Sequence, residues 1–223
     1  MKSAAKPSTR NQLRIIGGKW RGRKLDFPSI DGLRPTGDRV RETLFNWLAP
    51  YIVESRCLDL FSGSGALGFE AVSRGAASAL LIDANKQVTK QLEKNCEKLD
   101  AANIQIACHE AISWLKNSKQ PVAFKQQSTH LQHSNPLQSN HPSFDIIFLD
   151  PPFEKHLFDE VISLLDHSSA LSSQSLIYLE TPREYQFSTP KHWLQLKEKH
   201  AGQVSFYLYE YSKQADSDPI ITD

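Results

Sequence analysis

The chain has 223 residues, a length sufficient for one substantial α/β domain with a small appendage. No apolar run approaches the roughly 18 residues that a membrane span requires, and the basic first ten residues lack the apolar core of a secretory signal. The three cysteines, Cys57, Cys96 and Cys108, have no metal-like spacing and suit a reducing compartment, so we expect a cytoplasmic protein.

Charge is divided unevenly along the chain. Residues 1–50 hold 11 Lys/Arg and 4 Asp/Glu, a net charge of +7, whereas residues 51–223 hold 15 and 21, a net charge of −6. A basic N-terminal segment (the head) followed by a mildly acidic remainder suggests that the head binds a polyanion. Residues 1–12 lack apolar content and are predicted to form a disordered tail, and for residues 1–10 a solvated basic segment is the favoured explanation.

Residues 13–25 are predicted to form a hairpin of two short strands that turn at Gly17-Gly18. Cations surround a tryptophan there, a combination that offers phosphate contacts and a stacking surface to a nucleic acid. The same cations would suit a charged edge that protects a sheet from aggregation. We favour nucleic acid because the positive charge continues into the next segment; the candidate residues are Arg14, Lys19, Trp20, Arg21 and Arg23.

Residues 38–49 are predicted to form a helix with Thr36 as its N-cap and Pro50 as its stop. Its apolar stripe belongs to the core and consists of Val40, Leu44, Trp47 and Leu48. Three arginines lie near the helix start or on its polar face, where they could meet nucleic acid phosphates: Arg34, Arg39 and Arg41.

A glycine-rich turn follows a predicted strand over residues 56–61. Gly63, Gly65 and Gly68 have the spacing G-x-G-x-x-G, a helix follows to residue 74, and a second strand over residues 79–82 ends at Asp83. In this arrangement the glycine turn lets the backbone approach a ligand, and the acidic group binds ribose hydroxyls. The pattern therefore indicates a ribose-bearing cofactor, either a dinucleotide or S-adenosylmethionine (AdoMet).

Asp59 favours AdoMet over the dinucleotide. It lies inside the first of these strands, four residues before Gly63, where a buried carboxylate is unfavourable. A carboxylate there would repel a diphosphate but would attract a sulfonium and an α-ammonium. The alternative is an exposed strand residue, which the flanking Leu58 and Leu60 permit.

Residues 85–99 are predicted to form an amphipathic helix and residues 104–108 a third strand. Glu110, just beyond that strand, could bind the adenine amino group or cap the following helix, and both interpretations stay open. Residues 117–143 are a polar insertion rich in Gln, Ser, Asn and His. Its three histidines lack an acidic or cysteine partner at suitable spacing, so we expect no metal site; they are His130, His133 and His141.

Residues 144–149 form an almost wholly apolar run that predicts a strand buried on both faces. Asp150 follows at its carboxyl end, where open α/β sheets bind ligands, and Pro151-Pro152-Phe153 provide a rigid turn and an aromatic ring. An ordinary Asp-Pro turn is the alternative. A helix is predicted over residues 157–165, with an inward face of Leu157, Val161, Leu164 and Leu165. Strands over 176–179, 193–199 and 203–211 complete one open sheet, and residues 212–223 form a polar tail.

The motifs together resemble a known family. Asp59-x-Phe61-x-Gly63-x-Gly65, Asp83 and Asp150-Pro151-Pro152-Phe153 resemble class I AdoMet-dependent methyltransferases that act on exocyclic amines. RIIGGKWRGR (residues 14–23), LRPTGDRVRETLFN (33–46) and AGQV (201–204) resemble the bacterial 16S ribosomal RNA guanine-N2 methyltransferases, whose target is guanine 966. The resemblance spans roughly residues 13–211; the insertion is longer than the family needs, and Glu110 replaces a smaller polar residue.

The resemblance implies a Rossmann-like α/β sheet of order 3-2-1-4-5-7-6 with strand 7 antiparallel. It implies a head over residues 13–50 that faces RNA and a methyltransferase domain over 51–211. AdoMet would be the cofactor, bound by Asp59, Phe61, Gly63, Gly65, Asp83 and Glu110 without a metal, and 16S rRNA in the small ribosomal subunit, free or partly assembled, would be the partner of a monomer. Asp150, Pro151, Pro152 and Phe153 would hold the target amine.

Other functions stay open at this point. An amine methyltransferase acting on DNA adenine N6 or on protein is one alternative, but the acidic first residue of Asp150-Pro151-Pro152-Phe153 and the basic head weigh against it. A dinucleotide-dependent oxidoreductase would share the glycine turn. A ribosome-assembly factor would bind RNA without catalysis, although such a protein has no need of both the glycine turn and Asp150.

Overall fold

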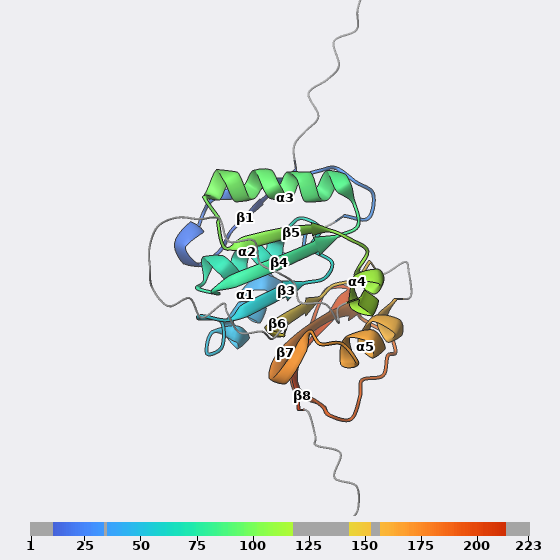
Figure 1. Ribbon diagram of the computed structural model, residues 1–223. Helices are drawn as coiled ribbons and strands as arrows, with labels where there is room; N and C mark the ends of the chain where they lie inside the picture. The colour runs from blue at the N-terminus through green and yellow to red at the C-terminus, as the bar shows by residue number, and fades with distance from the viewer. Residues whose placement is uncertain (1–10, 34, 118–142, 153–156, 213–223) are drawn as a thin grey trace, which may run out of the picture.

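The computed structural model describes residues 11–33, 35–117, 143–152 and 157–212 (Figure 1). The first part of the chain forms β1 (Asn11–Arg14), the 3-10 helix η1 (Gly18–Trp20), β2 (Lys24–Phe27), α1 (Asp38–Leu48), β3 (Arg56–Asp59), α2 (Ala66–Ser73), β4 (Ser78–Asp83) and α3 (Lys86–Leu99). The second part forms β5 (Ile104–Cys108), α4 (Ala111–Asn117), β6 (Phe144–Leu149), α5 (Phe158–Asp166), β7 (Leu171–Pro182), β8 (Trp193–Ala201) and β9 (Val204–Tyr211).

Seven strands form one sheet of order β5-β4-β3-β6-β7-β9-β8, and β1 and β2 form a separate antiparallel pair. The strands from β5 to β7 are parallel to their neighbours, and β9 runs antiparallel to both β7 and β8. The expected order 3-2-1-4-5-7-6 with an antiparallel strand 7 is therefore confirmed. The chain crosses over in opposite directions from the central β3, and in open α/β sheets ligands bind at the carboxyl ends of the two strands that flank such a point, here β3 and β6.

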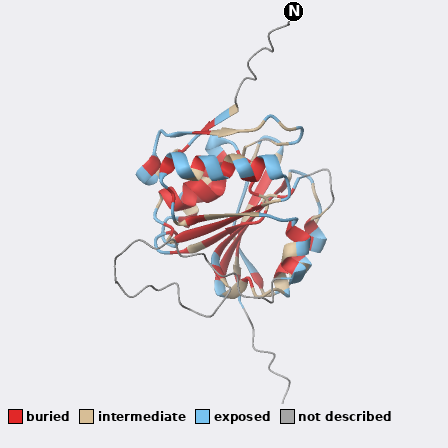
Figure 2. Cartoon of the chain, turned by 45° about the horizontal axis from the view of Figure 1, so that its top comes forward, coloured by how far each residue is buried: buried red, intermediate tan, exposed pale blue. Residues whose placement is uncertain are grey.

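Each face of the sheet carries its own apolar cluster, and the strands between them are buried (Figures 1 and 2). Helices α1, α2 and α3 and the β1–β2 hairpin cover one face, whereas α4 and α5 cover the other. The strand predicted at 144–149 has the expected bounds, and Ile146 to Leu149 are fully buried. Such burial on both faces is typical of parallel strands between helices.

The basic head belongs to this packed structure. Leu13, Ile15 and Leu25 share an apolar cluster with Leu44 of α1 and Leu92 of α3. The predicted hairpin is present, but its turn is not the tight Gly17-Gly18 turn that we expected. The backbone ladder ends at a bond from the Gly22 amide to the Ile15 carbonyl, 2.8 Å, so the turn comprises residues 16–21 and contains η1. The first strand begins at Asn11, inside the segment predicted as a tail.

A buried ion-pair network fastens the head to α2. Glu70, which is fully buried, accepts a bond from the Ile16 amide at 2.9 Å and pairs with Arg74 at 2.7 Å and Arg41 at 3.4 Å. Arg41 also donates to the Arg14 carbonyl at 3.0 Å and pairs with Asp38 at 2.6 Å. Each buried charge thus has several partners, the condition under which buried ion pairs are tolerated.

Two local expectations are wrong for tertiary reasons. Thr36 is not the N-cap of α1. The N-cap position is Gly37, which has no side chain to form a capping bond, and the Thr36 hydroxyl bonds Asp150 instead. In α5 the buried face is shifted by one residue from the predicted one, and Leu157 and Leu164 are only partly buried. The fully packed positions of α5 are Phe158, Val161, Ile162 and Leu165.

Candidate active site

Three acidic side chains converge at the carboxyl ends of neighbouring strands. Asp59 ends β3, Asp150 follows β6, and Glu180 lies near the end of β7. Because Phe148 is aligned with both Asp59 and Tyr178, and side chains alternate between faces, the three acids share the face that α1 and α2 cover. The negative charges of Glu180 and Asp59 both raise the pKa of Asp150.

Asp150 is held by the segment that precedes α1. The Thr36 hydroxyl donates a hydrogen bond to Asp150 Oδ2 at 3.2 Å, across 114 residues of sequence. Burial, followed by the charges of Glu180 and Asp59, raises the pKa of Asp150 well above its usual range, and the Thr36 bond opposes that rise. One carboxylate oxygen is therefore held by the head, and the buried site favours the protonated form of Asp150 more than water does.

Glu180 is a second buried acid in this site. Its side chain is 6% exposed, and the Tyr178 hydroxyl donates to its Oε2 atom at 2.6 Å. Burial raises the pKa of Glu180, and the bond from Tyr178 opposes that rise. The sequence does not single out Glu180, because one acid at the end of a strand carries no motif.

Asp59 is buried, so its interpretation as an exposed strand residue is wrong. Only 2% of the residue is exposed, and its Oδ2 atom accepts a bond from the Gly68 amide at 3.2 Å. Burial raises the pKa of Asp59 to about 7, the bond from Gly68 lowers it, and the charge of Asp83 raises it further. A cation beside it would stabilise the ionised form of this carboxylate, which is the chemistry that a sulfonium or an ammonium provides.

The glycine turn has the backbone that the motif requires. Gly65 has φ +78°, and a Cβ there would meet Phe69 at 2.6 Å and Leu92 at 2.7 Å. Gly63 has φ +49°, and a Cβ there would meet nothing closer than 3.9 Å, so the space beside it is open. Asp83 faces the same turn, because its Oδ2 atom accepts from the Gly63 amide at 3.0 Å. The predicted cofactor residues Asp59, Gly63 and Asp83 are thus brought together.

Phe61 and Glu110 flank this turn less directly. Phe61 is partly buried and packs against the apolar cluster beneath α4 and α5. Glu110 is exposed at the start of α4, where its carbonyl accepts from the Trp114 amide at 2.9 Å and its carboxylate accepts from the Ser113 hydroxyl at 2.6 Å. This geometry supports the helix-capping interpretation of Glu110.

The predicted RNA-binding residues divide into exposed and buried ones. Trp20 is 7% exposed and packs against Phe69, so it offers no stacking surface, and that expectation is wrong. Arg41 is fully buried in the network around Glu70, so it cannot meet a phosphate either. The remaining described cations are exposed and stay candidates: Arg14, Lys19, Arg21, Arg23 and Arg39.

Several predicted residues lie outside the described part of the chain. These are Arg34, Phe153, the tails over 1–10 and 213–223, and the insertion residues 118–142 with their three histidines. Within the described ranges, no group of three His, Cys, Asp or Glu side chains is arranged to hold a metal ion. None of the helices in those ranges combines the length and hydropathy needed to cross a lipid bilayer.

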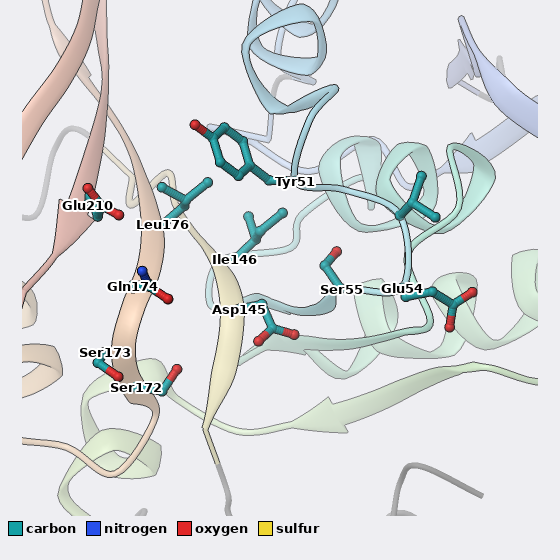
Figure 3. A pocket seen from close by; sticks show the side chains of 11 residues that line it. Tyr51, Glu54, Ser55, Asp145, Ile146, Ser172, Ser173, Gln174, Leu176 and Glu210 are labelled. Carbon is teal, nitrogen blue, oxygen red and sulfur yellow. The ribbon is translucent and has the colours of Figure 1, made fainter.

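A cavity of about 450 Å³ lies at the opposite end of the sheet (Figure 3). Its walls include Ser55, which precedes β3, Asp145 at the start of β6, and Ser172 at the start of β7. These are the amino ends of the strands that carry the acidic side chains. The cavity therefore shares no residue with the candidate active site.

Comparison with known proteins gives a consistent answer. The family described as Conserved hypothetical protein 95 matches residues 13–210. Ribosomal RNA small subunit methyltransferase D of Escherichia coli K12 is 46% identical over 208 residues, which cover 93% of this chain and 94% of that protein. The protein of the same name from Haemophilus influenzae is 45% identical, covering 94% and 100% of the two chains. The solved structure of yhhF from Escherichia coli has a TM-score of 0.76 and 42% identity, covering 92% and 100%.

Proposed function

This chain belongs to the Conserved hypothetical protein 95 family, among the relatives of ribosomal RNA small subunit methyltransferase D, and on that premise we propose that it methylates the exocyclic N2 of one guanine in 16S rRNA. AdoMet is the methyl donor in this proposal, and the guanine corresponds to guanine 966. The observation that carries the proposal is the convergence of Asp59, Asp83 and Asp150 on one edge of the sheet. The family relation disfavours the oxidoreductase and the DNA or protein methyltransferase.

The donor set fits AdoMet. Asp59 is a buried carboxylate at the glycine turn, which suits a cationic methionine portion, and the open space beside Gly63 accommodates a ligand close to the backbone. Asp83 at the end of β4 suits the ribose hydroxyls. When bound, AdoMet supplies a methyl group that is already electrophilic, so no metal is required in the proposal.

Asp150 performs the protein's part of the transfer. The guanine N2 lone pair is delocalised into the ring, so the amine is a poor nucleophile until its N–H groups are held by acceptors. Asp150 Oδ1 and the Pro151 carbonyl accept these N–H groups and stabilise the positive charge that develops on N2. Asp150, whose pKa is raised by burial and by its acidic neighbours, then takes the proton. Pro151-Pro152 restrict the motion of these acceptors, so orientation contributes to the rate.

The substrate must present a single unstacked base. Asp150 lies at the edge of a packed sheet beside buried Glu180, so a guanine inside an RNA helix cannot reach it without leaving the stack. The exposed cations of the hairpin, Arg21 and Arg23 among them, would hold the flanking RNA by its phosphates.

The test is transfer of tritiated methyl from AdoMet to small ribosomal subunits from cells that lack this protein, followed by mapping of the labelled base. Wild type should label one guanine at N2, and Asp150→Ala should reduce the rate at least a thousandfold while AdoMet affinity stays within a few-fold, since Asp150 acts on the amine. Asp159→Ala, which removes an exposed carboxylate from α5, is the matched control and should transfer normally. Label in another base or in protein would refute the proposed function.

A further inference from the structure

A small basic hollow lies beside the candidate active site. It has a volume of about 220 Å³ and is formed by the first turns of α1 and by the turn that joins β8 and β9. Each side contributes one exposed cation, Arg39 from α1 and Lys199 from β8, and Phe206 forms part of the wall. The β8–β9 turn contains Ala201-Gly202-Gln203-Val204, a motif for which the proposed function has no role.

The register of the sheet places this hollow next to the acids. Glu180 is aligned with Phe206, and Phe206 is aligned with Lys199, so these three side chains form a row on one face. With neighbouring strands about 4.8 Å apart, Lys199 lies about 10 Å from Glu180. On the other side, Arg39 comes three residues after Thr36, which is bonded to Asp150.

The backbone of the turn between β8 and β9, which follows Lys199, is anchored by Arg183. Gly202 has φ +61° at the first central position, as in a type II′ turn, and the Arg183 amide donates to the Gln203 carbonyl at 2.8 Å. The Arg183 side chain also donates to the Gly202 carbonyl at 3.4 Å.

The carboxylate of Glu198, the acidic residue next to Lys199 in the sequence, lies on the face away from Lys199. His200 is aligned with Ser205, so both lie on the opposite face from Lys199 and Phe206. There the His200 ring bonds the Ser205 hydroxyl at 2.8 Å and meets the Glu198 carboxylate at 3.5 Å. Arg39 and Lys199 are the Lys/Arg residues among those that line the hollow, and Thr43 and His200 also contribute to its lining.

We propose that this hollow binds a phosphate of the RNA strand next to the methylated guanine, with Arg39 and Lys199 as its charged ligands. The inference rests on the proposed function for its substrate but concerns a different set of residues. A guanidinium fork and an ammonium on two rigid elements suit a phosphate group, and phosphate contacts fix the register of a nucleic acid without reading its sequence. The C-terminal hairpin thereby joins the N-terminal one in fixing which base reaches Asp150.

The test compares the salt dependence of binding to deproteinised 16S rRNA for wild type, Lys199→Gln, and the double variant Arg39→Gln/Lys199→Gln. Loss of this one phosphate contact should lower the slope of log affinity against log salt by about 0.7 in the double variant, which should bind about 5-fold more weakly at 0.1 M salt. Lys199→Gln should lose part of that slope, because Arg39 remains. In the transfer assay the double variant should raise KM for small subunits, with kcat and the Kd for AdoMet unchanged.

Lys191→Gln is the matched control, because Lys191 is exposed two residues before β8, at the end of that strand away from the β8–β9 turn. It removes one charge but should leave the salt slope unchanged. A slope for Lys199→Gln equal to that of wild type or of Lys191→Gln would overturn the phosphate site. That outcome would not affect the proposed function, which fails only if the wild-type protein does not label guanine N2.

Discussion

Asp59 makes a specific prediction about stability, because the fold buries it without a cation. Its pKa in the folded protein is about 7, compared with an ordinary value of 3.8. Between these two values the folded state holds a proton that the unfolded state has lost, so protonation stabilises the fold below pH 7. The stabilisation disappears as the pH rises through 7, and between pH 5 and pH 8 Asp59 alone should lower the free energy of unfolding by about 3 kcal/mol.

Asp59→Asn removes this titration and keeps an oxygen that can accept from the Gly68 amide. Relative to the wild type, the ligand-free variant should therefore become more stable by about 3 kcal/mol between pH 5 and pH 8. Urea unfolding at several pH values measures the difference, in which the other titrating groups largely cancel. AdoMet should bind the variant more weakly, because the carboxylate that faces its positive charge is gone.

Two results would refute this reasoning. The first is a difference in unfolding free energy between wild type and Asp59→Asn that stays constant from pH 5 to pH 8, because Asp59 would then not titrate in that range. The second is unchanged AdoMet affinity in the folded variant at pH 8, where the wild-type residue is ionised. Glu93→Gln, which changes an exposed acid on α3, is a suitable control for the removal of one charge.

Two further predictions concern the contacts of the head. Thr36→Val should reduce kcat for RNA methylation about tenfold and shift the pH–rate profile to higher pH, because loss of the hydroxyl donor raises the pKa of Asp150. Thr36→Ser should restore both kcat and the profile, and failure of that rescue would contradict the role of the hydroxyl. Arg41→Met should destabilise the protein by about 3–5 kcal/mol in urea unfolding, because it leaves the buried Glu70 short of a cation; a loss below 1 kcal/mol would show that Arg74 alone suffices.

Much of the fold could be predicted because its signals are local. The apolar run at 144–149, the glycine turn and the acid at the end of β4 each depend on a few adjacent residues, and they placed Asp59, Asp83 and Asp150 correctly at the sheet edge. The order of the strands required the family resemblance, since spacing alone does not say which strands pair.

The errors arise where a distant partner decides the environment. Arg41 has the pattern of an exposed helix cation, and only the position of Glu70 on α2 makes it a buried ion pair. Trp20 is surrounded by cations in sequence, but its ring lies against Phe69. Thr36 fits the N-cap rule, but its hydroxyl instead reaches Asp150, 114 residues away. Such contacts connect separate parts of the chain, and no short window of sequence contains both partners.

The network around Glu70 also determines which molecule changes shape when enzyme and substrate meet. The hairpin and α1 are bonded through Arg41 and Ile16 to the helix that follows the glycine turn. RNA binding therefore cannot rotate the head relative to α2 without breaking buried ion pairs. The conformational adjustment falls on the nucleic acid, which must extrude its guanine toward a protein surface that is already assembled. An RNA region that is loosely stacked before encounter should accordingly be a faster substrate than a fully paired one.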